Sequence, residues 1–298
     1  SMPATKGDFF MRRLAIFCLA ISITGAAYAG HGVRNYGVSS VEECSPRNVQ
    51  FGDGYTTYVE KETLDASALR SIRIDAESSP VSVRGGDRYS VTVCKAAIST
   101  DLLREIHVSL DGNEIKTDGP NGRYWSVQYL ITTPPNAKVD VTATNGPLAL
   151  SQVDGTITAR AINGPLALDR LSGEVEASTT NGPISISGGT GNIKATAANG
   201  PISVELTGNS WRGGSLDAAS KNGPLTLVVP RGYNSGVVVE SNGRGPVSCR
   251  AEGCERARVW NEDDGRYMEP RRIELGHGAE SVHLTTVNGP ITIKESQD

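Results

Sequence analysis

Aromatic side chains are scarce in this chain and make up only 5% of its 298 residues. Apolar residues of all kinds reach 38%, whereas glycine is abundant, at 34 residues. This composition argues against a thick core of bulky side chains and favours a thin, repetitive one. A large charge of one sign is also lacking, because the net charge is only −4. We therefore expect neither a nucleic-acid partner nor an anionic membrane partner.

Closely spaced metal ligands and nucleotide-binding motifs are lacking as well. No Cys-x-x-Cys pair occurs, and the four histidines are scattered, at His31, His107, His277 and His283. The acidic stretch Asn261-Glu-Asp-Asp-Gly265 does not have the ligand spacing of an EF-hand and is predicted to be a polar turn. We therefore expect no metal ion and no other cofactor.

The N-terminal residues have the pattern of an export signal. A basic start, Met11-Arg12-Arg13, precedes an apolar run from Leu14 to Ile23, and Ala27-Tyr28-Ala29 gives a small-x-small cleavage pattern. We interpret residues 1–29 as the signal and residues 1–10 as an over-long start or a cloning remnant. The apolar run is too short for a typical membrane-spanning helix. The mature chain is therefore predicted to be periplasmic or secreted, without a membrane span.

The predicted mature chain contains four cysteines, Cys44, Cys94, Cys249 and Cys254. An even number in an oxidising compartment predicts disulfides, and three pairings are possible. Cys249 and Cys254 are five residues apart and could close a local loop, which would leave Cys44 to pair with Cys94.

A triplet, Asn-Gly-Pro, recurs six times, and its first four copies are spaced by 18 residues. The copies are Asn145-Gly146-Pro147, Asn163-Gly164-Pro165, Asn181-Gly182-Pro183, Asn199-Gly200-Pro201, Asn222-Gly223-Pro224 and Asn288-Gly289-Pro290. A loosened copy, Asn242-Gly-Arg-Gly-Pro246, falls 20 residues after Asn222. A repeat of this length is typical of a solenoid.

Apolar residues alternate with other residues on both sides of the triplet. Leu148 and Leu150 follow the first copy, and Val139, Val141 and Ala143 precede it. Period-two alternation predicts strands with one buried face. A single pair of such strands cannot bury its apolar face, so successive coils must stack at about 4.8 Å. We predict an all-β fold: a single-stranded parallel β-helix, flattened and right-handed, with about 18–20 residues per coil.

The rival fold for an 18-residue period is the triangular left-handed β-helix, which needs an aliphatic residue at every sixth position. Counting in sixes from Leu148 reaches Asp154 and Arg160, so this pattern fails. We interpret the triplet as a structural corner and not as a binding motif. The Asn is expected to adopt a left-handed conformation, the Gly angles forbidden to other residues, and the Pro a fixed φ. Stacked Asn side chains could also form a hydrogen-bonded ladder.

The regions outside the regular repeat are the places to look for function. We divide the mature chain into a non-repeating cap or lead, residues 30–65, and a solenoid, residues 66–298, with an irregular excursion at 250–281. Aromatic and sulfur side chains there form a possible contact patch, namely Trp211, Trp260, Tyr267 and Met268. The same side chains could instead cap the open end of the last coil.

The short Asn-Gly coils and the stretch Tyr129-Leu-Ile-Thr-Thr-Pro-Pro-Asn-Ala-Lys-Val-Asp-Val resemble a bacterial "putative adhesin" β-strand-repeat family. This domain of unknown function is related to the head GIN domain. The resemblance extends from about Leu69 to Lys294 and implies a β-solenoid without catalytic residues. The chain departs from the family pattern in the strict Pro after each Gly and in its four mature cysteines.

Our first hypothesis is an exported, noncatalytic solenoid that acts as an adhesin-like interaction module or as a structural module of the cell envelope. Its partner would be an envelope or extracellular protein or polysaccharide. The first alternative is a carbohydrate-active enzyme that uses Asp140 and Glu176 on the outer wall. These two carboxylates are expected two coils apart, at roughly 9–10 Å, near the upper end for inverting glycosidases. A second alternative is an accessory protein in envelope stress or signalling.

Overall fold

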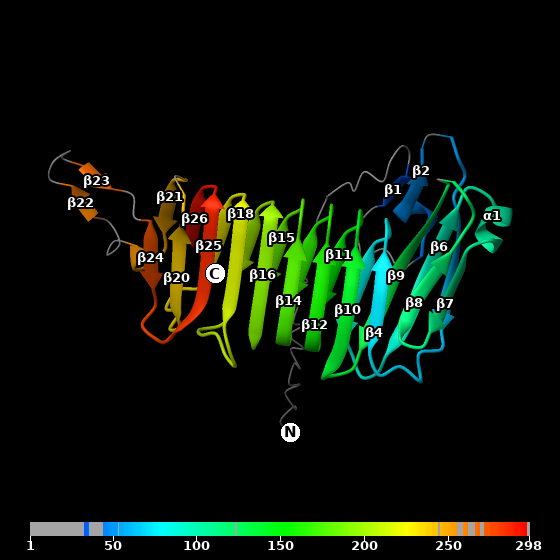
Figure 1. Ribbon diagram of the computed structural model, residues 1–298, viewed down its shortest axis with the longest axis horizontal. Helices are drawn as coiled ribbons and strands as arrows, with labels where there is room; N and C mark the ends of the chain where they lie inside the picture. Colours follow the sequence, from blue (N-terminus) through cyan, green and yellow to red (C-terminus); the bar gives the residue numbers. More distant parts are fainter. Residues whose placement is uncertain are drawn as a thin grey trace, which may run out of the picture.

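The computed structural model describes residues 33–35, 44–52, 54–122, 124–243, 245–254, 259–261, 266–268 and 271–296. The predicted export signal lies outside these residues. The described part is almost entirely β-structure, and it forms two large sheets that lie face to face along one elongated body (Figure 1). The predicted all-β class is therefore confirmed. No helix in the described ranges is long and apolar enough to cross a membrane.

Sheet I has eleven strands. In spatial order they are β7 (His107–Asp111), β8 (Glu114–Asp118), β4 (Ile72–Ala76), β10 (Ala137–Ala143), β12 (Asp154–Ala161), β14 (Ser172–Thr179), β16 (Asn192–Asn199), β18 (Leu216–Asn222), β25 (Glu280–Asn288), β20 (Gly236–Ser241) and β24 (Arg272–Leu275).

Sheet II also has eleven strands. In spatial order they are β3 (Tyr58–Leu64), β6 (Ser90–Ala97), β9 (Trp125–Thr133), β5 (Val81–Gly85), β11 (Leu148–Ser151), β13 (Leu166–Asp169), β15 (Ile184–Ser187), β17 (Ile202–Glu205), β19 (Leu225–Val229), β26 (Ile291–Glu295) and β21 (Val247–Arg250). The strand β3 lies within the predicted lead of residues 30–65 but pairs with β6 as the outermost strand of this sheet.

Four short strands and two short helices complete the described structure. The strands β1 (Val33–Asn35) and β2 (Val49–Phe51) pair with each other, as do β22 (Val259–Asn261) and β23 (Arg266–Met268). The helix α1 (Thr100–Arg104) begins after the N-cap Ser99, whose hydroxyl accepts from the Leu102 amide. A 3-10 turn, η2 (Pro46–Asn48), precedes β2.

Through the middle of the molecule, equivalent residues of successive repeats lie opposite one another in parallel strands. In sheet II, Leu148 pairs with Leu166, and Leu166 pairs with Ile184. In sheet I, Ile157 pairs with Val175 in the same way. These side chains are buried between the two sheets. The period-two alternation therefore identified both the strands and their inward faces.

The small residues at the centre of the sheet I strands are also buried, and they keep the core thin. They are Ala159, Ala177, Ala195 and Ala218. Larger aliphatic residues flank them on each strand, as Ile157 does on β12. This packing explains how so few aromatic residues suffice for a core that extends along the whole body.

The spatial order of the coils differs from the chain order at both ends of the body. The pair β4–β5 lies between β8–β9 and β10–β11, and the pair β25–β26 lies between β18–β19 and β20–β21. As a result, Asn222 lies opposite Asn288, and not opposite Asn242 of the loosened copy that follows it in the chain. At the C-terminal end, the chain passes over one coil position between β19 and β20 and fills it later with β25–β26. At the N-terminal end, the chain runs from β9 to β10 past the coil position that β4–β5 already occupy.

The Asn-Gly-Pro corners stack into the expected ladder of side-chain amides. Each Asn after Asn145 donates from Nδ2 to the Asn Oδ1 of the coil beside it, at 2.9–3.0 Å. The ladder runs through Asn145, Asn163, Asn181, Asn199, Asn222 and Asn288. The triplet therefore joins coils as well as turning the chain.

The backbone of the triplet does not have the conformation that we expected. Neither the Asn nor the Gly residues have a positive φ, so the predicted left-handed conformation is wrong. The glycines are needed for close approach: a Cβ on Gly182 would lie 2.1 Å from the carbonyl oxygen of Gly164. Positive φ angles occur instead at the opposite turn, for example 143° at Gly155 and 96° at Gly173.

Two disulfides join the regions outside the regular repeat to the sheets. Cys44 bonds to Cys94 on β6, and Cys249 on β21 bonds to Cys254. Of the three possible pairings, this is the one in which Cys249 closes a local loop. Near the first disulfide, Val49 and Phe51 pack with Ala96 in a second, small core.

Candidate functional site

A row of polar and charged side chains crosses the outer face of sheet I, one from the centre of each of seven neighbouring strands, β4 to β25 in spatial order. We call it the outer row. Its members lie opposite one another in register: Arg73, Asp140, Thr158, Glu176, Lys194, Asp217 and His283. Because their chain neighbours are buried between the sheets, these residues face outward at intervals of about 4.8 Å.

At one end of the outer row, Asp140 is held between two arginines. Its Oδ2 is 3.0 Å from Nη2 of Arg73, and its Oδ1 is 3.3 Å from Nη1 of Arg160. Thr158 separates it from Glu176, so the two carboxylates are about 10 Å apart by strand spacing. Both oxygens of Asp140 already accept charged hydrogen bonds. This arrangement fits a structural ion pair better than a proton-transfer pair.

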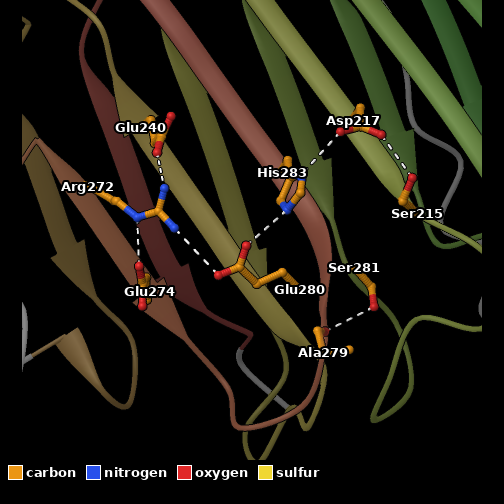
Figure 2. A network of polar contacts seen from close by, with 9 residues as sticks. All are labelled: Ser215, Asp217, Glu240, Arg272, Glu274, Ala279, Glu280, Ser281 and His283. Carbon is orange, nitrogen blue, oxygen red and sulfur yellow. Dashed lines mark hydrogen bonds and ion pairs between the residues drawn. The ribbon is translucent and has the colours of Figure 1, made fainter.

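Toward the other end, a continuous polar chain links the outer row to neighbouring residues. Asn192 donates to Glu174 at 2.7 Å, and its Oδ1 accepts from the Ser215 amide at 3.1 Å. The Ser215 hydroxyl donates to Asp217 at 2.9 Å. Asp217 in turn lies 3.2 Å from Nδ1 of His283 (Figure 2). These contacts cross four strands or their ends and fix the side chains relative to one another.

The series of polar contacts continues from His283, through Glu280, to Arg272, which contacts three glutamates (Figure 2). Nε2 of His283 is 3.6 Å from Glu280, and Glu280 is 3.5 Å from Arg272. Arg272 also donates to Glu274 at 2.6 Å and bonds Glu240. The hydrogen bonds to Glu274 and Glu240 raise the pKa of Arg272. The cluster ties together β18, β25, β20 and β24.

A shallow, open depression of about 420 Å³ lies over the middle of the outer row. Its polar lining comprises Thr156, Thr158, Glu174, Glu176, Asn192, Lys194, Ser215 and Asp217. Lys194 lies between Glu176 and Asp217 in register, so these two carboxylates are not adjacent. Within the described ranges, no three His, Cys, Asp or Glu side chains are grouped to hold a metal ion.

The predicted contact patch is corrected at Trp211. This side chain is only 8% exposed and packs in the hydrophobic core, and its indole Nε1 donates to the Gly191 carbonyl at 2.9 Å. Trp260 lies opposite Tyr267, and Met268 opposite Val259, in the β22–β23 pair. Their side chains lie outside the described residues, so their share of the patch stays a prediction.

Exposed aromatic residues occur at the other end of the body, where we had not placed a site. Tyr55, Tyr58 and Tyr124 are 50%, 41% and 46% exposed. The rings of Tyr55 and Tyr124 are 5.3 Å apart, and a hydrogen bond to Tyr124 raises the pKa of Tyr55. The signal in the sequence was the glycine-rich, polar surroundings of Tyr55, which do not suit a core position. Extending the outward alternation to Val282 and Leu284 would likewise have identified His283.

Comparisons with known proteins do not assign a family. No family model and no curated protein matches the sequence. Among solved structures, a "putative cell adhesion protein" from Clostridium sporogenes is 11% identical, with a TM-score of 0.28 over 80% of this chain and 100% of that one. A "putative adhesin" from Bacteroides fragilis is 8% identical, with a TM-score of 0.33 over 80% and 97%. A "putative lipid binding protein" from Parabacteroides distasonis is 10% identical, with a TM-score of 0.25 over 83% and 98%. These scores are too low to support an argument about fold or function.

Proposed function

We propose that this chain is an exported, noncatalytic interaction module that presents the outer face of sheet I to an envelope or extracellular protein or polysaccharide. The scaffold that we infer is a flattened, right-handed parallel β-helix. Parallel pairing between strands one repeat apart supports it, as does the alternation of successive strands between the two sheets from β10 to β19. The two disulfides fit an oxidising compartment, periplasmic or extracellular.

The observation that carries the proposal is the in-plane pairing of the outer row. Asp140 is neutralised by Arg73 and Arg160 on the same face, and Asp217 accepts from the Ser215 hydroxyl and lies 3.2 Å from Nδ1 of His283. A catalytic pair of carboxylates needs an acid and a base free to face one substrate bond. A rigid array of paired polar groups instead suits recognition without chemistry, because little side-chain entropy is lost when a partner binds.

A charge exchange within the outer row tests this function. The double substitution Glu176→Lys with Lys194→Glu keeps the net charge but reverses the local pattern. We expect retention of envelope proteins or polysaccharides on the immobilised mature chain to fall about tenfold, equivalent to about 1.4 kcal/mol. The matched control is Thr226→Glu with Thr292→Lys, an adjacent pair on the outer face of sheet II, which should leave retention unchanged.

The parent protein is also assayed for cleavage of a broad panel of polysaccharides. Cleavage of any polysaccharide by the parent, abolished by Glu176→Gln or Asp140→Asn, would establish the enzyme and refute our proposal. Equal retention by the exchanged variant and the parent would remove the outer row from the interaction.

A further inference from the structure

The coil formed by β25 and β26 fills a slot that the chain itself leaves open. After β19 ends at Val229, the chain passes over one coil position and begins β20 at Gly236. Residues 280–295 then return to occupy that position, between β18–β19 on one side and β20–β21 on the other. Figure 1 shows β25 lying between β18 and β20. The two coils that form the slot, β18–β19 and β20–β21, therefore both come before β25–β26 in the chain.

The slot binds its occupant through the same kinds of contact that join the other neighbouring coils of the body. Four aliphatic side chains of the occupant are at most 1% exposed: Val282, Leu284, Ile291 and Ile293. On one side, Asn288 donates to Asn222 at 2.9 Å, and the Gly223 amide donates to the Asn288 carbonyl at 2.9 Å. On the other side, the Ile291 amide donates to the Pro246 carbonyl at 2.9 Å.

The corner of the occupant is as tightly fitted as those of the inner coils. A Cβ on Gly289 would lie 2.1 Å from the Gly223 oxygen, and a Cβ on Gly245 would lie 1.9 Å from the Gly289 oxygen. The slot thus selects a strand–corner–strand unit with a strict Asn-Gly-Pro corner. A second copy of this chain carries such a unit with every matching side chain.

The connection to the occupant allows the unit to be supplied from another molecule. The strand β24 pairs with β20 on the far side of the slot, so the exchanged unit is residues 272–295, and residues 255–271 connect it to Cys254. Within this connection, the described strands β22 and β23 pair with each other. A stretch of this length can span up to about 60 Å when extended. The Cys249–Cys254 disulfide closes its loop before the connection begins, on the side of β21, and does not tie the unit to the slot.

We propose that two copies of this chain associate by exchanging residues 272–295, so that each slot is filled by the last coil of the other copy. All buried contacts and the Asp217–His283 and Glu240–Arg272 pairs are remade in the exchanged form. The two arrangements then differ in which molecule the connecting residues join and in the entropy of association, so the exchanged fraction depends on protein concentration. This interaction with a second copy is independent of the partner on the outer row.

A crosslink between two singly substituted chains tests the exchange. Thr226 on β19 lies opposite Thr292 on β26, and a strand spacing of about 4.8 Å is within disulfide range. Chains carrying Thr226→Cys and chains carrying Thr292→Cys are mixed, held just below their melting temperature and then oxidised. In the exchanged form, and only there, the two new cysteines meet. We expect a covalent heterodimer on a non-reducing gel whose amount rises roughly in proportion to protein concentration.

The matched control mixes Ser185→Cys with Ser203→Cys. These residues face each other on β15 and β17, which belong to coils outside the exchanged unit, so no heterodimer is expected. Circular dichroism checks that all four variants fold, and light scattering measures the unsubstituted chain over the same concentrations. A folded test pair that yields no more heterodimer than the control, with the unsubstituted chain monomeric throughout, would overturn the proposal. Loss of binding through the outer row would leave this result unchanged.

Discussion

Replacing one corner glycine by alanine tests the stacking of the coils directly. In Gly182→Ala, the new Cβ would lie 2.1 Å from the Gly164 carbonyl oxygen and 2.7 Å from its carbon. A favourable contact between such atoms is roughly 3.3 Å or longer. The corner must therefore open by about 1 Å, because the obstacle is backbone and cannot rotate away. The change would strain hydrogen bonds that join the coils, such as that from the Asn181 amide to the Ile162 carbonyl at 2.7 Å.

The size of the effect follows from these two costs. Overpacking in a tightly fitted site costs about 1–3 kcal/mol. Each weakened hydrogen bond adds up to about 1 kcal/mol, and one or two are at risk. We expect the free energy of unfolding to fall by about 3 kcal/mol. The comparison is Gly208→Ala: Gly208 has a φ of 67° and no atom within 4 Å of an added Cβ. In Gly208→Ala the free energy of unfolding should fall only by the cost of holding a non-glycine residue at positive φ, about 1–2 kcal/mol.

Urea unfolding followed by far-ultraviolet circular dichroism measures both variants against the parent. An unchanged slope with a lower midpoint identifies a true loss of stability. If Gly182→Ala loses less than about 1 kcal/mol, or less than Gly208→Ala, then close approach is not the reason for glycine at the corner. The repeated glycine would then need another explanation, because its φ is not positive.

The repeating middle of the fold was predictable because each of its features is local and recurs. Alternation around Leu148 and Leu150 identifies a strand and its buried face without knowledge of distant residues. The 18-residue spacing then sets the register, since Leu148 must lie opposite Leu166 for both to stay buried. The Asn ladder follows from the same spacing.

The order of the coils at the ends was not predictable in this way. Asn242 and Asn288 both begin a corner, so pattern alone does not decide which of them stacks on Asn222. The structure suggests a physical rule. Asn288 belongs to the strict triplet and is stacked between two coils, whereas the loosened corner of Asn242 lies in the β20–β21 coil, which is stacked on Asn288's coil. A corner enclosed on both sides tolerates no extra residue; a corner nearer the end does.

The candidate site was predictable in part. Alternation identified the outward positions of Asp140 and Glu176, but not the Arg73 that pairs with Asp140, because Arg73 comes from a strand that is distant in the chain. Trp211 was misjudged for a related reason. It lies in a glycine-rich loop, a composition typical of exposed loops, yet its indole donates to the Gly191 carbonyl of the preceding coil. Burial of this kind depends on how loops stack, which the local pattern does not record.

Two further predictions concern stability. Replacing Cys44 and Cys94 by serine should cost about 4 kcal/mol and replacing Cys249 and Cys254 about 2 kcal/mol, because the loops close over 50 and 5 residues; equal losses in urea unfolding would contradict this entropic account. Burial raises the pKa of Tyr233 from 10.0 to about 12. The unfolded chain therefore loses this proton first, and the free energy of unfolding should fall as pH rises from 10.0 to about 12. Urea unfolding at pH 9 and pH 11.5 should show a smaller loss for Tyr233→Phe than for the parent. An identical loss in both proteins would mean that Tyr233 ionises as freely in the folded chain as in the unfolded one.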